Sequence, residues 1–315
     1  MKKSIWILAI VVLLLICFFV FQKTEQRTFV SSENISGAIS KNQVWSGNIS
    51  VTGDVIVKRG VTLTILPGTI VTVTSFSDDQ RGGRDHARDE PFPKDPDRKE
   101  TSSTIIQING ILNASGAPEN KIIFTTDKKQ TTYDWDGLSI DRGVLNYAIV
   151  EYARYNRIQE TSEVVISNST IRNSLECCLC IGHANPISPK ILNNDIYNCG
   201  HEGIDIGGGS ATIKGNYFHV ENPEIQPEPL WGRVGVVIYQ NSYPTIEDNR
   251  FEKLLWAILL SDSSGQDRED KRAIVRNNII QDNEVAFSIS SGYVRDAVLR
   301  ENNTLINNTN EEIED

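Results

Sequence analysis

Short stretches in which apolar and polar residues alternate follow one another along most of the chain. Clear examples are Gly137-Leu138-Ser139-Ile140, Gly203-Ile204-Asp205-Ile206 and Ala286-Phe287-Ser288-Ile289. Alternation with a period of two residues is typical of a β-strand that buries one side. The segments are too short and too rich in β-branched residues for helices. The pattern predicts an all-β fold.

A second pattern, Ile-x-x-Asn-x-apolar, recurs between these stretches with a mean period of about 27 residues. Its copies begin at Ile166, Ile191, Ile213, Ile246, Val275 and Leu299. A repeat of this length predicts coils that stack into a parallel β solenoid and share one core. A β-sandwich would instead show hairpin turns and has no reason to keep one motif in one phase.

The repeated Asn predicts a turn in which each side-chain amide bonds the equivalent Asn of the next coil. Asn also tolerates the left-handed backbone that such turns need. The predicted column is Asn194, Asn216, Asn249, Asn278 and Asn302.

The N-terminus has the pattern of a membrane segment. Lys2 and Lys3 precede an apolar run that ends at Phe21, at the short end of what spans a bilayer. The positive-inside rule places the two lysines in the cytoplasm and the rest of the chain outside. We predict an uncleaved signal anchor over residues 1–21, with a cleaved signal peptide as the alternative. Polar residues 22–43 are predicted to form a stalk.

Several motifs resemble a known family. Val44-Trp45-Ser46-Gly47, Gly60-Val61-Thr62-Leu63-Thr64-Ile65-Leu66-Pro67-Gly68-Thr69 and Asp134-Trp135-Asp136-Gly137 resemble the opening coils of secreted bacterial and archaeal β-helix proteins. The downstream repeats resemble the right-handed parallel β-helix of the pectin-lyase-like superfamily. The resemblance covers residues 44–309 and implies that residues 44–74 form an N-terminal cap and first coil. It leaves residues 310–315 as an acidic tail.

Residues 75–103 interrupt the repeats as a charged, Pro-containing insertion. Its acids include Asp78, Asp79, Asp85, Asp89, Glu90, Asp95 and Asp97. The insertion is interpreted either as a solvated loop or as a loop organised by calcium, which prefers carboxylate oxygens. No other cofactor is predicted. The formal net charge of −10 argues against nucleic acid as a partner, because phosphate-backbone binding needs clustered Lys and Arg.

Alignment of the strand copies places chemically active residues in columns. Glu176, His201 and Arg233 fall in one column, and Asp205 follows His201 by four residues. Neighbouring coils lie about 4.8 Å apart, so these four residues form a candidate acid–base site. Residues Gly207-Gly208-Gly209 are expected to leave open space beside them. The alternatives are surface residues without a role, or a zinc site made by Cys180, His183, His201 and Asp205.

Aromatic residues offer a candidate binding surface. Trp231, Tyr239, Tyr243 and Trp256 fall on neighbouring coils, where they are expected either to stack on sugar rings or to pack loops against the solenoid. Cys177 and Cys199 fall on adjacent coils, but their alignment is three positions out of step. A disulfide between them is therefore allowed without being indicated.

These features favour a membrane-tethered, extracytoplasmic and non-catalytic module. The expected partner is a polysaccharide or another cell-surface molecule. The alternative is a polysaccharide-processing enzyme, a lyase or a hydrolase, that acts in a groove along the solenoid. Gly200-His201-Glu202-Gly203 only loosely resembles the Gly-His-Gly motif of polygalacturonase-type hydrolases, and the paired aspartates of those enzymes are missing.

Overall fold

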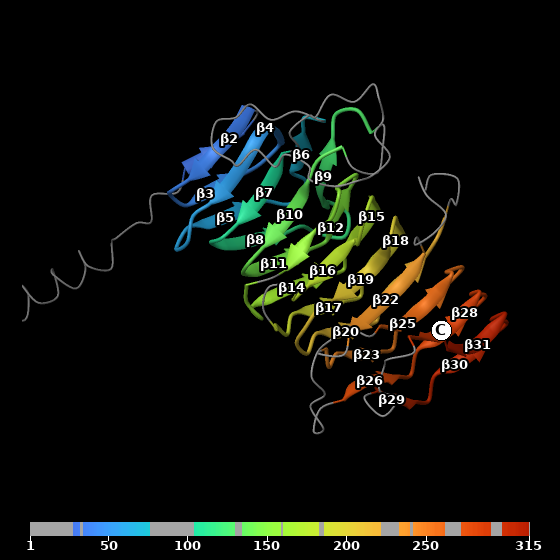
Figure 1. The fold of residues 1–315 in the computed structure, drawn as a ribbon. Helices are drawn as coiled ribbons and strands as arrows, with labels where there is room; N and C mark the ends of the chain where they lie inside the picture. Colours follow the sequence, from blue (N-terminus) through green and yellow to red (C-terminus); the bar gives the residue numbers. More distant parts are fainter. Residues whose placement is uncertain are drawn as a thin grey trace, which may run out of the picture.

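The structure is a computed structural model in which every regular element of the described residues is a β-strand (Figure 1). Among these residues no helix is long and apolar enough to cross a membrane. The predicted signal anchor at residues 1–21 lies outside the described part. The described residues are 28–31, 34–75, 104–129, 134–158, 160–182, 186–221, 233–239, 242–261, 272–290 and 298–314.

The strands form a parallel β-helix whose coils have three faces. Each coil passes through face 1, then face 2, then face 3, and each strand pairs in parallel with its counterparts one coil away. Face 1 is an 11-stranded sheet in the described part of the chain. It consists of β1 (Thr28–Val30), β3 (Gln43–Trp45), β5 (Thr62–Ile65), β8 (Ile111–Ser115), β11 (Gly143–Asn146), β14 (Val164–Ser167), β17 (Lys190–Leu192), β20 (Thr212–Lys214), β23 (Thr245–Glu247), β26 (Ala273–Arg276) and β29 (Val298–Glu301).

Faces 2 and 3 are joined through two longer strands, β2 (Asn34–Ile39) and β4 (Asn48–Val57), which run across both. The first half of β4 pairs with face 2 and its second half with face 3. Face 2 continues with β6 (Ile70–Val73), β9 (Ile122–Thr126), β12 (Ala148–Glu151), β15 (Thr170–Ser174), β18 (Asp195–Cys199), β21 (Tyr217–His219), β24 (Arg250–Glu252), β27 (Ile279–Gln281) and β30 (Thr304–Ile306). Face 3 continues with β7 (Ile105–Ile108), β10 (Gly137–Ile140), β13 (Arg157–Ile158), β16 (Leu179–Ile181), β19 (Glu202–Ile206), β22 (Val234–Tyr239), β25 (Trp256–Ser261), β28 (Val285–Ile289) and β31 (Asn310–Glu314).

The alternation read from the sequence is confirmed on face 3. Ile204 and Ile206 of β19 are fully buried, whereas Asp205 between them points outward and is half-buried. Ile206 pairs with Ile181 on one side and Ile238 on the other, so apolar residues stack on apolar residues through the core. One coil cannot bury these side chains alone, and the shared core therefore holds the stack together.

The predicted Asn column lies at the turn from face 1 to face 2. The Asn216 side-chain amide donates to Asn249 Oδ1 at 3.0 Å and to the Ile191 carbonyl at 2.9 Å, and the next coils repeat these bonds. The last member is Asn303 and not the predicted Asn302, because the residue before each ladder Asn has the left-handed backbone. Asn302 is that preceding residue, with φ 52°.

The β-helix extends beyond both predicted boundaries. Strands β1 and β2 lie within residues 22–43, predicted to be a stalk, and their register with β3 and β4 corrects the start of the domain from Val44 to Thr28. Residues 44–74 are therefore not the first coil. The predicted acidic tail also belongs to the fold, because Asn310 of β31 pairs with Val285. The end strands β1, β29 and β31 are more exposed than the strands of the middle coils.

Candidate functional site

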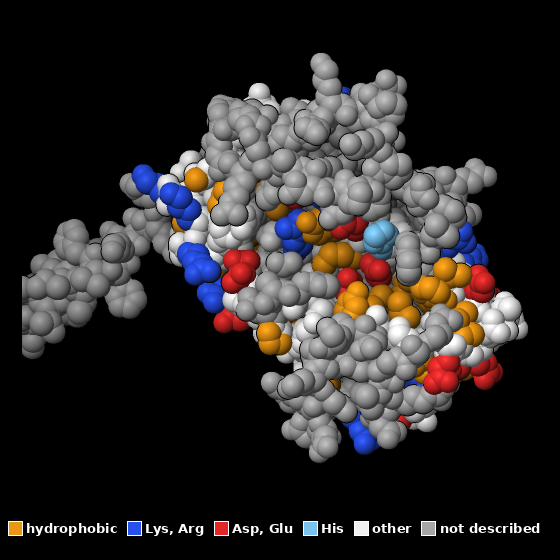
Figure 2. Space-filling view, viewed as in Figure 1, with side chains coloured by type: hydrophobic (Ala, Val, Ile, Leu, Met, Phe, Trp, Pro, Cys, Tyr) orange, Lys and Arg blue, Asp and Glu red, His pale blue; other side chains and the backbone are white. Residues whose placement is uncertain are grey.

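Outward-pointing residues of face 3 form a column whose chemical character changes along the solenoid. Consecutive register partners are Ile56, Gln107, Ser139, Arg157, Cys180, Asp205, Val237, Leu259, Ser288 and Ile313. Figure 2 shows acidic, basic, histidine and apolar side chains gathered on the side of the molecule where Figure 1 labels β10, β16, β19 and β22. Its polar members run from Gln107 to Asp205, and Ser288 is a further polar member near the C-terminal end.

A groove of about 500 Å³ runs along this polar half of face 3. Its lining comes from four consecutive coils, those of β4, β7, β10 and β13, which span about 14 Å at the usual strand spacing. We call it the face 3 groove. Its hydrogen-bonding side chains are Asp54, Arg59, Gln107, Asn109, Ser139, Asp141, Arg157 and Glu160.

Two amides occupy the centre of the face 3 groove. The Gln107 side-chain amide donates to Asn109 Oδ1 at 2.8 Å, so each side chain orients the other. The Gln107 carbonyl oxygen and the Asn109 amide nitrogen supply an acceptor and a donor beyond that bond. Asp54 instead accepts from the backbone N–H of Ile105 at 2.8 Å, which holds β4 against β7.

The pKa of the Asp141 carboxyl is raised above its ordinary value. Burial, and then the negative charge of Glu160, raise the pKa of the Asp141 carboxyl to about 6, although Arg59 and Arg142 oppose the shift. Arg59 lies 3.8 Å from Glu160 in an ion pair with both side chains largely exposed. Asp141 therefore keeps its proton to a higher pH than an exposed carboxyl does, and can donate a hydrogen bond or a proton in the groove.

Arg157 closes the groove toward the middle of face 3. Its guanidinium lies 3.3 Å from Asp136 and 3.8 Å from the centre of the Tyr155 ring. Both contacts keep the guanidinium plane in place, and its N–H groups are rigidly placed donors.

The predicted acid–base residues do stack on consecutive coils. The His201 N–H donates to the Glu176 carbonyl at 3.4 Å, and the Val234 N–H, next to Arg233, donates to the His201 carbonyl at 3.2 Å. The side chains engage different neighbours, however. The Glu176 carboxylate accepts from Arg154 at 2.7 Å, and Arg233 lines a small pocket with Gly203 and His219.

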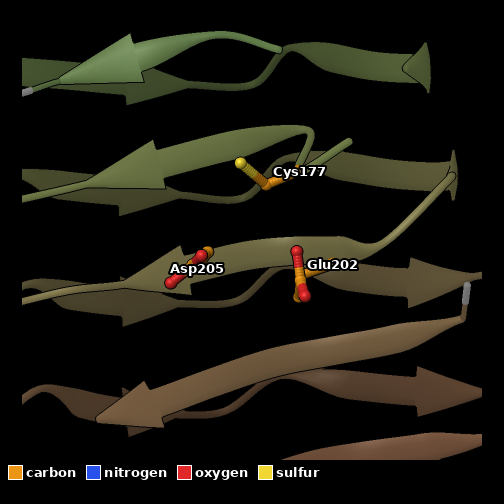
Figure 3. Close-up of side chains that lie close together, drawn as sticks. All are labelled: Cys177, Glu202 and Asp205. Carbon is orange, nitrogen blue, oxygen red and sulfur yellow. The ribbon is translucent and has the colours of Figure 1, made fainter. Parts of the chain in front are cut away.

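Asp205 is brought together with a residue that the sequence interpretation passed over. Glu202 and Asp205 both point outward from β19, with the buried pair Gly203 and Ile204 between them. Burial, and then the charges of Asp205 and Glu176, raise the pKa of Glu202 to about 8. Oxygen atoms of Glu202 and Asp205 and the Cys177 sulfur lie within 4.8 Å of one another (Figure 3).

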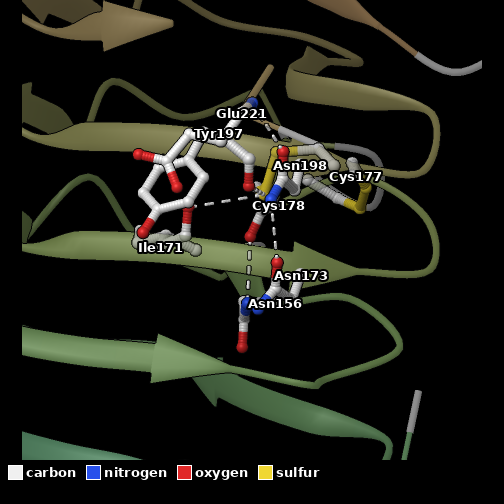
Figure 4. Close-up of a disulfide and its surroundings, with 10 residues drawn as sticks. Asn156, Ile171, Asn173, Cys177, Cys178, Tyr197, Asn198 and Glu221 are labelled. Carbon is white, nitrogen blue, oxygen red and sulfur yellow. Dashed lines mark hydrogen bonds between the residues drawn. A yellow bond between two sulfur atoms is a disulfide. The ribbon is translucent and has the colours of Figure 1, made fainter. Parts of the chain in front are cut away.

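The four cysteines in the described part of the chain form two disulfides. Cys178 bonds Cys199 between adjacent coils, and Cys177 bonds Cys180 within one coil. Figure 4 shows Cys177 and Cys178 with their surroundings. Cys199 therefore pairs with Cys178 and not with Cys177, because the chain places Cys178 inside, where it is fully buried. The zinc site considered for Cys180, His183, His201 and Asp205 does not form in this state, because Cys180 is in a disulfide. His183 lies outside the described residues.

The predicted aromatic surface is not continuous over the described residues. Tyr239 is five residues along β22 from Val234, the register partner of Trp256, so the two positions are roughly 16 Å apart along the strand direction. Tyr243 lies beyond the end of β22, where its N–H donates to the Gly209 carbonyl at 2.6 Å. Trp231 lies outside the described residues. Tyr239 instead adjoins Asp205 and Glu202, and burial followed by their charges raises its pKa to about 12.

The predicted open space at Gly207-Gly208-Gly209 is filled by backbone. A Cβ atom on Gly209 would lie 2.0 Å from the Ile187 carbonyl oxygen, and Gly209 bridges Ile187 and Ser242 of the neighbouring coils. Glycine is needed there because the coils approach closely.

Sequence reasoning missed Gln107, Asn109, Asp141 and Glu160. The strand alignment started with the copy Gly137-Leu138-Ser139-Ile140, so it omitted the coil of β7, and Asp141 fell between the columns that were compared. A signal was present: Gln107 in Ile105-Ile106-Gln107-Ile108 interrupts apolar residues as Ser139 does in the next coil. The calcium interpretation concerns residues 76–103, which lie outside the described part of the chain.

A family model described as a right-handed β-helix region matches residues 157–314, half of the chain. The chain belongs to this family. The match confirms the right-handed parallel β-helix that the resemblance implied. No curated protein matches this β-helix protein.

Two solved structures of PfbA, a surface adhesin of Streptococcus pneumoniae, are similar to it. The first is 14% identical, with a TM-score of 0.37, and the similarity covers 87% of this chain and 91% of that one. The second is also 14% identical, with a TM-score of 0.41, and the shares are 85% and 83%.

Proposed function

We propose that this β-helix protein is a membrane-tethered, extracytoplasmic module that binds a glycan in the face 3 groove without altering it chemically. The observation that carries the proposal is the groove itself. It has a volume of about 500 Å³, and hydrogen-bonding side chains from four consecutive coils line it. The tether is the predicted signal anchor, outside the described residues.

The spacing of the groove suits a polymer of sugars. Neighbouring coils are about 4.8 Å apart, which is close to the length that one sugar ring adds to an extended glycan. Successive rings can therefore contact equivalent positions of successive coils. The lining alternates amides, a hydroxyl, guanidinium groups and carboxylates. Sugar hydroxyls both donate and accept, and a mixed lining of this kind can satisfy them along the chain.

The charged side chains of the face 3 groove indicate which class of glycan it binds. Arg59 and Arg157 already face acids, Glu160 at 3.8 Å and Asp136 at 3.3 Å. Asp54 and Asp141 add further acidic groups to the lining. The groove therefore lacks the excess of positive charge that a polyanionic glycan requires, and a neutral polysaccharide is the expected ligand.

The test is glycan-array binding by the full-length protein in detergent. Gln107→Ala and Asn109→Ala should each weaken binding of the selected glycan about tenfold, the usual loss for one or two hydrogen bonds. Gln281→Ala on β27 is the matched control, because Gln281 points outward from face 2 and away from the groove. Equal binding by all three variants and the parent protein would refute the groove as the binding site.

A second candidate function is glycan hydrolysis, favoured by the raised pKa of Asp141 beside Glu160. A carboxyl that holds its proton to about pH 6 is suited to protonate a leaving oxygen, while an ionised neighbour acts as base or nucleophile. Glu176, His201, Asp205 and Arg233 remain the alternative catalytic set. Reducing-sugar release from the bound glycan distinguishes these outcomes: Asp141→Asn abolishes turnover in the first case, and His201→Ala or Asp205→Ala in the second.

A further inference from the structure

Two cysteines and two carboxylates meet on face 3, beyond the end of the groove. Cys177 and Cys180 stand three residues apart at the start of β16, and Glu202 and Asp205 stand three residues apart on β19. Cys180 is the register partner of Asp205, and the Cys178 N–H donates to the Glu202 carbonyl at 2.8 Å. We call these four residues the thiol–carboxylate cluster. None of them belongs to the lining of the face 3 groove.

The distances within this cluster are close to those of a metal site. The Cys177 sulfur and one oxygen from each of Glu202 and Asp205 lie within 4.8 Å of one another (Figure 3), and the Cys180 sulfur is bonded to that of Cys177. Ligands of a tetrahedral zinc ion are about 3.3 to 3.8 Å apart, given zinc–ligand bonds of about 2.0 to 2.3 Å. Small side-chain rotations therefore suffice to bring four ligand atoms around one ion.

The charge distribution also favours a cation. Glu202 and Asp205 place two carboxylates close to each other, and each side chain is only partly exposed. The arginines of the preceding coils are committed to other acids: Arg154 to Glu176 at 2.7 Å and Arg157 to Asp136 at 3.3 Å. A divalent ion between the two carboxylates would replace repulsion with attraction.

The two disulfides differ in what their reduction would do to the fold. The Cys178–Cys199 disulfide joins adjacent coils across 21 residues, and both sulfurs lie in the core. The Cys177–Cys180 disulfide joins residues three apart in the same coil and lies outside the apolar core cluster, although Cys177 and Cys180 are only 4% and 9% exposed. Parallel strand pairing and the core hold that coil in place independently of it, so this bond can be reduced while the β-helix stays folded.

We propose that reduction of the Cys177–Cys180 disulfide creates a zinc-class metal site, held by the two thiolates together with the carboxylates of Glu202 and Asp205. A phosphine serves as reductant: it takes an oxygen atom from water, leaves as the phosphine oxide, and the two hydrogens of that water end on the two sulfurs. Metal binding then displaces the thiol protons, because zinc binds thiolate and not thiol. Two sulfur and two oxygen ligands suit zinc better than calcium or magnesium, which prefer all-oxygen sites.

The test compares oxidised and phosphine-reduced full-length protein in detergent, without oxygen. Thiol titration should find two more thiols in the reduced native protein than in the oxidised protein, and Zn²⁺ titration against a chromophoric chelator should find one tight site in the reduced form alone. Co²⁺ in place of Zn²⁺ should give the absorption of a tetrahedral thiolate site. Absence of the two thiols in the folded protein, or absence of zinc uptake once they are present, would overturn the proposal.

Variants identify the ligands. Cys177→Ser, Glu202→Gln and Asp205→Asn should each lower zinc affinity at least tenfold, whereas Glu301→Gln, an exposed acid on β29 of face 1, should leave it unchanged. Circular dichroism checks that each variant is folded. If Cys177→Ser fails to fold, Glu202→Gln still tests the site, because it keeps both thiols. Zinc uptake that survives both carboxylate substitutions, or that requires Cys178 and Cys199 instead, would contradict the assignment.

Discussion

The turn between faces 1 and 2 and the outer side of face 3 occupy the same coils but follow opposite rules. At the turn, Asn194, Asn216, Asn249 and Asn278 repeat one residue in one geometry, and each bonds the next. On face 3 the equivalent position changes from coil to coil, from Arg157 to Cys180 to Asp205. The residue type is the same in successive coils where their side chains bond one another, and it differs from coil to coil on the outer side of face 3.

The same contrast separates the inner and outer residues of a single strand. Ile206 lies in the shared core, so Ile206→Asp should bury an unpaired carboxylate at a cost of about 5 kcal/mol. Asp205→Ala, one residue earlier, should leave the stability of the oxidised protein unchanged or slightly higher, because it removes a charge near Glu202. Chemical denaturation of both variants measures this. Equal destabilisation would mean that β19 does not alternate as described.

Breaking the Asn ladder tests the turn directly. Asn249 donates to the Ile213 carbonyl at 2.9 Å and to Asn278 at 3.0 Å, and accepts from the Asn216 amides. Asn249→Ala leaves several buried groups without partners and should cost about 4 kcal/mol of unfolding free energy. Gln107→Ala on face 3 removes a side chain of similar polarity and should cost under about 0.5 kcal/mol. A similar loss of unfolding free energy in both variants would contradict the distinction between the Asn turn and the outer side of face 3.

The two disulfides extend the comparison to covalent bonds. Cys178→Ser combined with Cys199→Ser opens a crosslink across 21 residues and should lower stability by about 3 kcal/mol. Cys177→Ser combined with Cys180→Ser opens a crosslink within one coil and should lower it by clearly less. Thermal melting of the two double variants, in the absence of reductant, ranks them. A larger loss of stability for the Cys177 and Cys180 double variant would show that the Cys177–Cys180 disulfide is the one that stabilises the fold more.

The smallest expected effect concerns the pH dependence contributed by Asp141. Its pKa is raised to about 6 in the folded protein from 3.8, so the unfolded chain releases this proton first. The contribution of Asp141 to stability is therefore complete below about pH 4 and is lost as the pH rises through about 6. Asp141→Asn should remove this decline, which we expect to be about 1 kcal/mol, because the group is partly solvated. Denaturation midpoints at pH 4 and pH 7 measure the difference between the two proteins.

The repeating parts of the molecule were predictable because they are local and periodic. Alternation in segments such as Gly203-Ile204-Asp205-Ile206 indicated which residues point inward, and the Asn period indicated the ladder. The last ladder residue was placed one position early, at Asn302, because the final copy is degenerate and only the left-handed backbone of Asn302 distinguishes it from Asn303. The strands over 28–39 were missed because polar end coils resemble a linker.

The sequence by itself determined the fold class, the direction of the core residues and the turn that joins the coils, since each follows from a pattern repeated along the chain. Only the tertiary structure decided which different groups become neighbours. The pairing of Cys178 with Cys199, the approach of Cys177 to Glu202 and Asp205, and the groove from Asp54 to Arg157 all depend on the register of successive coils. Loop insertions change the number of residues per coil, so this register cannot be counted from residue numbers alone.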